Sequence, residues 1–328
     1  PLQEGVPMRA VRVHEFGGPE VLRVDDVPDP TAGPGEVLVE VTAIGLNYGE
    51  TLQRSRASAE LYDWYPQPPL PTTLGLEVAG VVRAVGQDVS GDLIGTEVLG
   101  FSLTGGYAEL AVLPAAGAFP LPKDLDARTA LALFVQGVTA VGLMDAAHAE
   151  PGERVLVEAA AGGVGSLLVQ LVTRAGATAV ALARGGAKLA LAKELGADEV
   201  VDYDVPDWAA AVSPVDVVLS SVGGGISTAA FGLLRDGVGR MVVYGTASGA
   251  YPEITVKDLV RKGVGVSGLS NLAGDPVYMR ELLDRAFALG ASGELRPVLG
   301  ESWALGEAVA AHRALEARTT TGKQFLIP

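Results

Sequence analysis

Hydrophobic and polar residues alternate along the first third of the chain. Val37, Val39 and Val41 fall on one face of their segment. Glu40 and Thr42 fall on the opposite face. A period of two is typical of a strand with one buried face in an antiparallel sheet or barrel. The same pattern, broken by Gly and Pro, recurs at residues 8–27, 75–86 and 95–101.

From about residue 126 the pattern changes to alternating helix-like and strand-like segments. Strand-like runs occur at 155–160, 177–183, 199–203 and 215–223, and helical runs occur at 166–176 and 188–197. This alternation predicts a parallel sheet, and continuous apolar strands such as VDVVL suit a sheet covered by helices on both faces. Two further helices are expected at 277–290 and 305–318. We expect the final apolar strand, QFLIP, to pair back into the first domain.

One segment fits neither pattern. Residues 55–75 carry four prolines together with Tyr62, Trp64 and Tyr65. Because proline lacks an amide hydrogen and restricts the residue before it, this run predicts an extended loop with several aromatic side chains to place.

Composition limits the possible functions. The chain has 328 residues, 48% of them hydrophobic and 19% charged, which suits two packed domains and excludes a disordered chain. Its 24 Lys and Arg stand against 39 Asp and Glu, a formal net charge of −15. Because such a surface repels polyanions, nucleic acid and anionic membranes are poor partners. The start of the sequence lacks the charged-then-apolar order of residues that is typical of a signal peptide, and polar residues interrupt the most apolar stretches. We therefore expect a cytoplasmic protein.

Metal and thiol chemistry has little support in the sequence. The chain has no cysteine, which removes disulfides, thiolate nucleophiles and thiolate-ligated metal sites. His14, His148 and His312 lie far apart and lack metal-ligand spacing. Each is therefore interpreted as a surface or structural histidine, and no metal is expected.

A glycine-rich turn between a strand-like and a helical run carries the first functional signal. It reads AxGxxG from Ala160 through Gly162 to Gly165, with Gly163 and Val164 between the last two glycines. Gly162 lets the backbone approach a pyrophosphate, and Gly165 lets helix and strand pack closely. The amides at the helix start attract negative charge. This context within a βαβ unit indicates dinucleotide binding; a turn that serves packing alone is the other interpretation.

The second strand of this unit ends with cations. NAD-binding versions of the turn usually have Asp or Glu there, which accepts hydrogen bonds from ribose hydroxyls. This chain has Arg184, 19 residues after Gly165, then Lys188, and no carboxylate before Glu194. Because guanidinium and ammonium groups bind a 2′-phosphate, the pattern favours NADPH. Solvated surface charges are the alternative interpretation of both cations.

Four tracts occur in the order VQGVTA, AAAGGVGSLLVQL, ALAKELGADEVVDY and HRALEARTTTGKQFLIP. Together they resemble the zinc-free quinone oxidoreductase (zeta-crystallin-like) branch of the medium-chain dehydrogenase/reductase superfamily, over nearly the whole chain. The resemblance implies an α/β fold with a GroES-like β-barrel catalytic domain (1–128 and 272–328). It implies a Rossmann domain with a doubly wound parallel sheet (129–271) that binds NADPH, and a homodimer joined along sheet edges near Val264 to Ser267.

Zinc-dependent members of that superfamily hold their metal with Cys and His ligands. In this chain the corresponding positions look like Asn47, Leu76 and Gln136, none of which is a thiolate or imidazole. Without a zinc Lewis acid, the resemblance implies hydride transfer to an acceptor that delocalises charge onto its own oxygen, such as a quinone or an α,β-unsaturated carbonyl.

The resemblance also implies roles for individual residues. Asn47 and Thr139 would line the nicotinamide pocket, and Gly163 and Val164 would belong to the pyrophosphate turn. Lys188, Tyr203 and Arg318 would flank the 2′-phosphate. Contacts with ribose and nicotinamide would fall on Ser221, Val222, Gly245, Thr246, Ala247 and Asn271. A packed aromatic side chain and a helix cap are the alternatives for Tyr203 and Arg318.

The proton donor and the aromatic loop each have two interpretations. The phenol of Tyr48 can donate to the developing oxyanion, or Tyr48 is structural and solvent supplies the proton. Many quinone reductases have a further aromatic residue nearby, where this chain has Leu52. Tyr62, Trp64 and Tyr65 either stack on a planar acceptor and exclude water, or pin a surface loop.

Three functions agree with these residues. The main hypothesis is an NADPH-dependent reductase of a small-molecule quinone or conjugated enone. The second is a reductase of enoyl thioesters. The third is a largely non-catalytic NADPH-binding protein.

Overall fold

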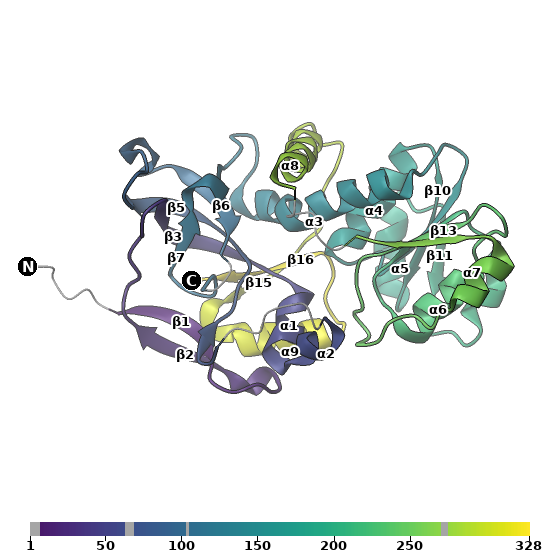
Figure 1. The fold of residues 1–328 in the computed structure, drawn as a ribbon, viewed down its shortest axis with the longest axis horizontal. Coiled ribbons are helices and arrows are strands. Elements are labelled where there is room, and N and C mark those ends of the chain that lie inside the picture. The colour runs from purple at the N-terminus through teal and green to yellow at the C-terminus, as the bar shows by residue number, and fades with distance from the viewer. Residues whose placement is uncertain (1–6, 63–68, 103–104, 270–274) are drawn as a thin grey trace, which may run out of the picture. The chain divides into compact units, whose positions relative to one another are not determined.

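The computed structural model describes residues 7–62, 69–102, 105–269 and 275–328 (Figure 1). The chain forms two compact units. We call them unit 1 (Pro1–Ala132 with Leu299–Pro328) and unit 2 (Leu133–Val298).

Unit 1 contains two sheets. A three-stranded sheet has the order β2-β1-β4, built from β1 (Met8–Val13), β2 (Leu22–Val27) and β4 (Thr72–Thr73). A seven-stranded sheet has the order β15-β16-β3-β5-β6-β8, and β7 also pairs with β3. Its strands are β3 (Glu36–Leu46), β5 (Glu77–Val85), β6 (Glu97–Phe101), β7 (Leu110–Pro114), β8 (Ala118–Pro120), β15 (Leu299–Ala304) and β16 (Lys323–Ile327). Helices α1 (Tyr48–Ser55), α2 (Ala57–Leu61) and α9 (Ala308–Glu316) complete the unit.

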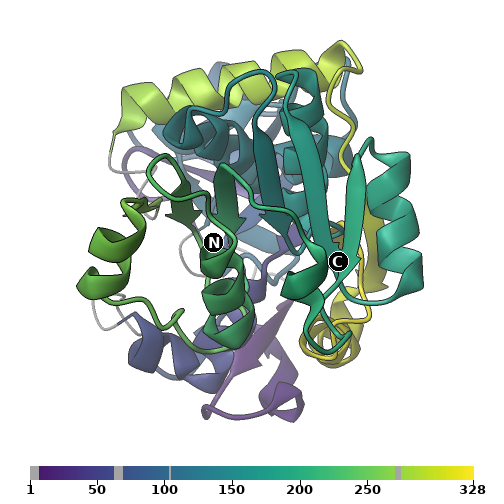
Figure 2. The ribbon, with the colours of Figure 1, turned by 90° about the vertical axis from the view of Figure 1, so that its right-hand side faces the viewer.

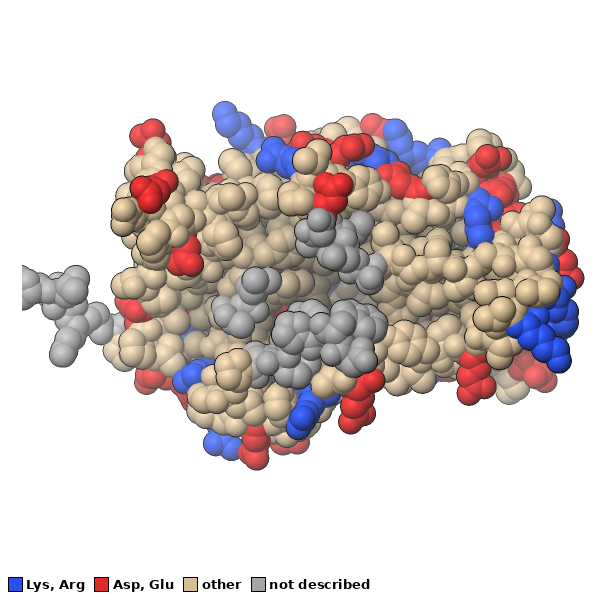
Figure 3. Space-filling view, viewed as in Figure 1, with Lys and Arg blue, Asp and Glu red and all other residues tan. Residues whose placement is uncertain are grey.

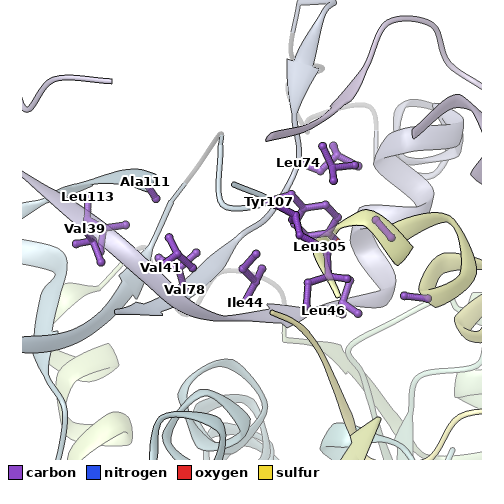
Figure 4. Close-up of a cluster of buried hydrophobic side chains, with 14 of the residues drawn as sticks. Val39, Val41, Ile44, Leu46, Leu74, Val78, Tyr107, Ala111, Leu113 and Leu305 are labelled. Atoms are coloured by element: carbon purple, nitrogen blue, oxygen red, sulfur yellow. The ribbon is translucent and has the colours of Figure 1, made fainter. Parts of the chain in front are cut away.

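Strand β3 is the centre of unit 1, and its alternation is confirmed. Val37, Val39 and Val41 are buried, whereas Thr42 on the opposite face is exposed. The buried face joins side chains from β5, β7 and the segment before β5 in one core (Figure 4). β3 pairs with β5, β7 and β16, so its backbone edges are hydrogen-bonded, while the side chains of this core cover its apolar face.

The chain end returns to unit 1, as the sequence predicted. β16 runs antiparallel to β3, with Gln324 opposite Leu46 and Leu326 opposite Ile44. Helix α9 precedes β16 and lies against α1 (Figure 1). Residues from the two ends of the chain therefore meet beside the C-terminal end of β3.

Unit 2 is a doubly wound parallel sheet. Its strand order is β11-β10-β9-β12-β13-β14, and all described pairings in it are parallel (Figure 2). The chain starts at β9 and builds outward on both sides, so the strand order reverses beside β9. The strands are β9 (Arg154–Glu158), β10 (Thr178–Ala183), β11 (Glu199–Asp202), β12 (Val217–Ser220), β13 (Arg240–Val243) and β14 (Gly265–Gly268). The helices are α4 (Gly163–Arg174), α5 (Gly186–Glu194), α6 (Gly224–Gly232), α7 (Val256–Lys262) and α8 (Pro276–Ala291), together with α3 (Ala127–Ala147) from Leu133 onward.

The structure corrects the expected loop at residues 55–75. Helix α2 occupies part of it, because Ala, Glu and Leu are good helix formers. Arg56 adopts a left-handed conformation with a φ of 67°, which ends α1 and redirects the chain into α2. Trp64 and Tyr65 lie outside the described residues.

The boundary between the units differs from the sequence-based one. It falls after Val298 rather than after residue 271, so α8 belongs to unit 2. Arg285 of α8 donates to both carboxylate oxygens of Asp145 at 2.6 and 2.8 Å, and the Tyr278 hydroxyl donates to the same carboxylate at 3.1 Å. Asp145 lies on α3 (Ala127–Ala147), more than a hundred residues earlier, so a local pattern does not reveal this contact.

Helix α3 is a core helix by its burial. Its length and hydropathy would suffice to cross a membrane, but 72% of its most apolar window is buried inside the protein. A buried helix that is apolar on most sides is expected in the core of a large protein.

Charged side chains of both signs are mixed on the surface. On the face drawn in Figure 3, Asp and Glu are interspersed with Lys and Arg. Pairs such as Arg9 with Glu109, at 2.7 Å, neutralise individual cations.

Candidate active site

The glycine-rich turn joins β9 to α4 in unit 2. A Cβ atom on Gly165 would lie 2.2 Å from the carbonyl oxygen of Ala159, and one on Gly162 would lie 3.2 Å from the same oxygen. Because real Cβ atoms do not approach a backbone oxygen to 2.2 Å, position 165 requires glycine while the turn keeps this shape. Ala159 itself has a φ of 49°, a conformation that costs energy for a residue with a side chain.

Helix α4 begins with open donors at this turn. The amide of Ser166 donates a helical hydrogen bond to the carbonyl oxygen of Gly162, at 3.0 Å. The three amides between these residues belong to the first turn of α4, where an α-helix offers no internal acceptor. Amides and helix dipole together suit a pyrophosphate.

Glu158 organises the neighbouring loop and was not predicted as a site residue. It ends β9 and is fully buried. Its Oε2 atom accepts hydrogen bonds from the amides of Ser221 and Val222 at 2.9 and 2.8 Å. The same atom accepts from the hydroxyls of Ser220 and Ser227 at 3.2 and 2.8 Å. Burial raises the pKa of Glu158, and these four hydrogen bonds oppose the rise. A lone charge at the end of an apolar strand was the signal in the sequence.

Five of the predicted cofactor residues gather after β12 and β13. The amide of Ala247 donates to the carbonyl oxygen of Ser221 at 2.9 Å. A Cβ atom on Gly245 would lie 3.1 Å from that same oxygen, and Thr246 between them is buried. The hydrogen bond from its backbone amide to Glu158 holds Val222 in place. Parallel strands place their carboxyl ends on one edge of the sheet, which explains why these loops meet.

Arg184, one of the predicted phosphate-binding cations, has an acidic neighbour. Arg184 follows β10, and its Nε atom lies 3.0 and 2.9 Å from the two carboxylate oxygens of Asp204. Its guanidinium carbon lies 5.7 Å from the centre of the Tyr203 ring. Asp202 accepts the amide hydrogen of Gly185 at 3.1 Å. The local sequence of β10 and α5 has no carboxylate before Glu194, but β11 pairs with β10 and brings Asp202 and Asp204 alongside.

In unit 1, Asn47 is the N-cap of α1 and is held on all sides. Its amide donates to Oε2 of Glu50 at 3.0 Å. Its Nδ2 atom donates to the carbonyl oxygen of Gly45 at 3.2 Å and to Oε1 of Glu77 at 3.1 Å. Its Oδ1 atom accepts from Nζ of Lys323 at 2.9 Å. An anion on one end and a cation on the other define the orientation of the carboxamide.

A buried ion pair supports Asn47. Lys323 Nζ lies 2.5 Å from Oε1 of Glu77, and the two side chains are 2% and 0% exposed. Burial raises the pKa of Glu77, and the ammonium group of Lys323 opposes that rise. The partners are 246 residues apart, so only the pairing of β16 and β5 with β3 brings them together. Neither was predicted as a site residue.

A second buried chain of polar groups extends from Asn47 toward α9. The Tyr107 hydroxyl donates to Oε2 of Glu50 at 2.5 Å, and it lies 3.0 Å from Nε2 of His312. Burial raises the pKa of Glu50 and lowers that of His312 to about 3. His312 is therefore a structural histidine in this unit, one of the two roles that its isolated position predicted.

Tyr48 and Arg318, two predicted site residues, meet in unit 1. The guanidinium carbon of Arg318 lies 4.1 Å from the centre of the Tyr48 ring. A cation at this distance over an aromatic face is attracted by the ring quadrupole and fixes the ring plane. Arg318 follows α9 with a φ of 58°.

The other predicted residues lie on separate elements. The hydroxyl of Thr139 donates to the carbonyl oxygen of Val135 at 2.7 Å within α3. Lys188 lies in the first turn of α5, and Tyr62 follows α2. Asn271, Trp64 and Tyr65 lie outside the described residues.

Known proteins are similar to this chain over almost its whole length. Residues 33–123 match the alcohol dehydrogenase GroES-like domain, and residues 195–326 match the zinc-binding dehydrogenase family. A quinone oxidoreductase of Pseudomonas aeruginosa is 33% identical over 98% of this chain and 99% of its own length. The chain belongs to the quinone oxidoreductase family of the medium-chain dehydrogenase/reductase superfamily.

Solved structures of this family have the same fold. A quinone oxidoreductase of Escherichia coli, complexed with NADPH, is 31% identical with a TM-score of 0.89, covering 98% of this chain and all of that one. A quinone oxidoreductase of Pseudomonas syringae is 34% identical with a TM-score of 0.88 and the same coverage. In this chain, unit 1 is thus the GroES-like domain and unit 2 is the Rossmann domain.

The zinc named in one matching family does not fit the residues of this family member. At the positions that the family resemblance matches to zinc ligands, the chain has Asn47, Leu76 and Gln136, whose side chains are two amides and an alkyl group. The ammonium group of Lys323, 2.9 Å from Oδ1 of Asn47, would repel a dication there. Among the residues described, no three His, Asp or Glu side chains gather as metal ligands.

Proposed function

We propose that this protein is an NADPH-dependent reductase that transfers a hydride to a quinone or an α,β-unsaturated carbonyl without a catalytic zinc ion. The observation that carries the proposal is the glycine turn of unit 2, where a Cβ atom on Gly165 would meet the backbone at 2.2 Å. A turn so closely packed before open helix amides suits a dinucleotide pyrophosphate. The full-length likeness to quinone oxidoreductases supports the acceptor class.

In this proposal unit 2 holds NADPH, which supplies the hydride. The turn from Gly162 to Gly165 binds the pyrophosphate. Glu158 keeps the loop at Ser221 and Val222 in place through its buried carboxylate. Arg184 and Lys188, with Tyr203, bind the 2′-phosphate; Arg318, which was also predicted there, lies in unit 1 over the Tyr48 ring. Thr139, Gly245, Thr246, Ala247 and Asn271 complete the contacts with ribose and nicotinamide.

Unit 1 supplies the groups proposed to act on the acceptor. Hydride addition to a quinone or enone places negative charge on the acceptor oxygen, which a proton must then neutralise. Asn47, fixed between Lys323 and Glu77, orients the reacting partners. Tyr48, oriented by Arg318, donates the proton, with solvent as the alternative donor.

Steady-state assays test the function. We expect oxidation of NADPH with a panel of quinones and enones, at a rate that 1,10-phenanthroline leaves unchanged. Loss of turnover on removal of tightly bound zinc would contradict the metal-free mechanism. Faster reduction of a crotonyl thioester than of any quinone would select the enoyl-thioester alternative. Tight NADPH binding with no acceptor reduced would select the non-catalytic alternative.

The Tyr48→Phe variant tests the proton donor. If Tyr48 donates, kcat falls at least about tenfold while the Kd for NADPH stays constant, because general acid catalysis contributes about 10²- to 10⁴-fold. An unchanged kcat with a solvent isotope effect equal to that of the wild type assigns the proton to solvent.

We also propose a homodimer formed through β14, the edge strand of the unit 2 sheet. All four residues of β14 are exposed, and Val256 and Val260 of the preceding helix are 75% and 77% exposed. A second copy of the strand would satisfy the open edge and cover these valines. Light scattering should give twice the chain mass for the wild type and a lower mass for Val266→Lys; a monomeric wild type would refute the dimer.

A further inference from the structure

Arg184 of the proposed 2′-phosphate site already has an anionic partner. Both carboxylate oxygens of Asp204 lie within 3.0 Å of its Nε atom. The two side chains are 47% and 48% exposed, so the pair lies at the surface where a cofactor phosphate would arrive. The Tyr203 ring lies beside the same guanidinium group.

The fold of unit 2 holds this pair in place. β10 and β11 run parallel, with Ala183 opposite Asp202, so the residues that follow the two strands meet at one sheet edge. Asp202 then ties both segments together, because its two oxygens accept the amide hydrogens of Gly185 at 3.1 Å and of Asp204 at 3.0 Å. These hydrogen bonds from backbone amides to Asp202 keep Asp204 next to Arg184, and they do not involve the carboxylate of Asp204 itself.

We propose that Asp204 is a specificity-determining residue that competes with the cofactor's 2′-phosphate for Arg184 and so limits the discrimination between NADPH and NADH. This inference rests on the proposed NADPH-dependent function. Asp204 engages the Nε donor of Arg184 and offsets the charge of its guanidinium group, and the carboxylate repels the charge of a 2′-phosphate bound beside it. NADH has a neutral 2′-hydroxyl, which leaves the ion pair intact and experiences no such repulsion.

The expected effect is moderate because the pair is half exposed. Exposed ion pairs contribute little, so we expect Asp204→Asn to tighten NADPH binding by about threefold to fivefold and to leave NADH binding within about 1.5-fold. Asparagine keeps the size of the side chain and the backbone amide that donates to Asp202. The gain should shrink in high salt, since salt screens charges at the surface.

Calorimetric titration of the full chain with NADPH, NADH, adenosine 2′,5′-bisphosphate and 5′-AMP tests the inference. The matched control is Asp207→Asn, which removes an exposed carboxylate three residues further on and keeps a residue type that tolerates its φ of 54°. This control should change no dissociation constant by more than about 1.5-fold. A double-mutant cycle adds Arg184→Gln, in whose background Asp204→Asn should tighten NADPH binding less than in the wild type, because only the direct repulsion between carboxylate and phosphate is then relieved.

The outcomes separate this inference from the proposed function. Equal changes for NADPH and NADH, or an undiminished gain in the Arg184→Gln background, would overturn the role of Asp204 while leaving NADPH as the cofactor. Failure of the wild-type protein to bind NADPH or adenosine 2′,5′-bisphosphate would overturn the proposed function, and the inference with it.

Discussion

His312 should make the protein sensitive to mild acid. It lies on α9 and is fully buried, with Nε2 3.0 Å from the Tyr107 hydroxyl. That hydroxyl has one hydrogen and gives it to Glu50, so His312 must donate from Nε2. Its Nδ1 atom has no hydrogen-bond partner among the described residues, which corresponds to a neutral imidazole. Burial, and then the nearby charge of Arg54, lower the pKa of His312 to about 3.

The size and sign of the effect follow from this pKa. In the unfolded chain histidine titrates near 6.5, so the unfolded state binds a proton that the folded state refuses until about pH 3. The stability that this group contributes is complete above pH 6.5 and is lost as the pH falls toward 3. Each pH unit in that window costs about 1.4 kcal/mol, so roughly 2 kcal/mol is lost by pH 5.

The variant His312→Gln removes this titration and keeps a donor for Tyr107. Urea unfolding at pH 5, 6, 7 and 8 should show that the free energy of unfolding of the wild type, relative to the variant, falls by about 2 kcal/mol from pH 7 to pH 5. Glu50 and Glu77 titrate in both proteins and largely cancel in the difference. Hydrogen exchange in peptides covering α9 assigns the transition to unit 1.

The matched control is His148→Asn, which replaces an exposed histidine that has a φ of 48°. Its free energy of unfolding should follow the wild-type pH dependence. If His312→Gln also follows the wild-type curve, His312 is not held neutral by burial and the reasoning fails.

Three more changes test unit 2. Gly165→Ala should weaken NADPH binding at least about tenfold, measured by fluorescence titration, because its Cβ would overlap the Ala159 oxygen; unchanged binding would refute the close approach. The melting temperature of Glu158→Gln, relative to that of the wild type, should increase as the pH rises from 5 to 8. The pKa of Glu158 is raised in the folded state, so ionisation of this carboxyl destabilises the folded wild type, whereas Gln does not ionise; a relative decrease would contradict this. Lys188→Ala should weaken NADPH by about 1.5–3 kcal/mol more than NADH; equal losses would show that Lys188 does not contact the phosphate.

Local patterns in the sequence predicted the architecture. The alternation around Val39 predicted β3, the AxGxxG turn predicted the junction of β9 and α4, and the apolar end predicted the return of β16. Each of these features is encoded by residues within about ten positions of one another, because strand period and turn conformation depend on near neighbours. The family resemblance rested on four short tracts, two of which contain the AxGxxG turn and the apolar end.

The polar partners of the site came only from the tertiary structure. Lys323 meets Glu77 and Asn47 across 246 and 276 residues, and Asp204 meets Arg184 because β11 lies beside β10. The sequence alone determined which segments form strands, helices and the glycine turn. Which charges become neighbours was decided by the order of strands in each sheet, since that order brings together side chains that no local pattern relates.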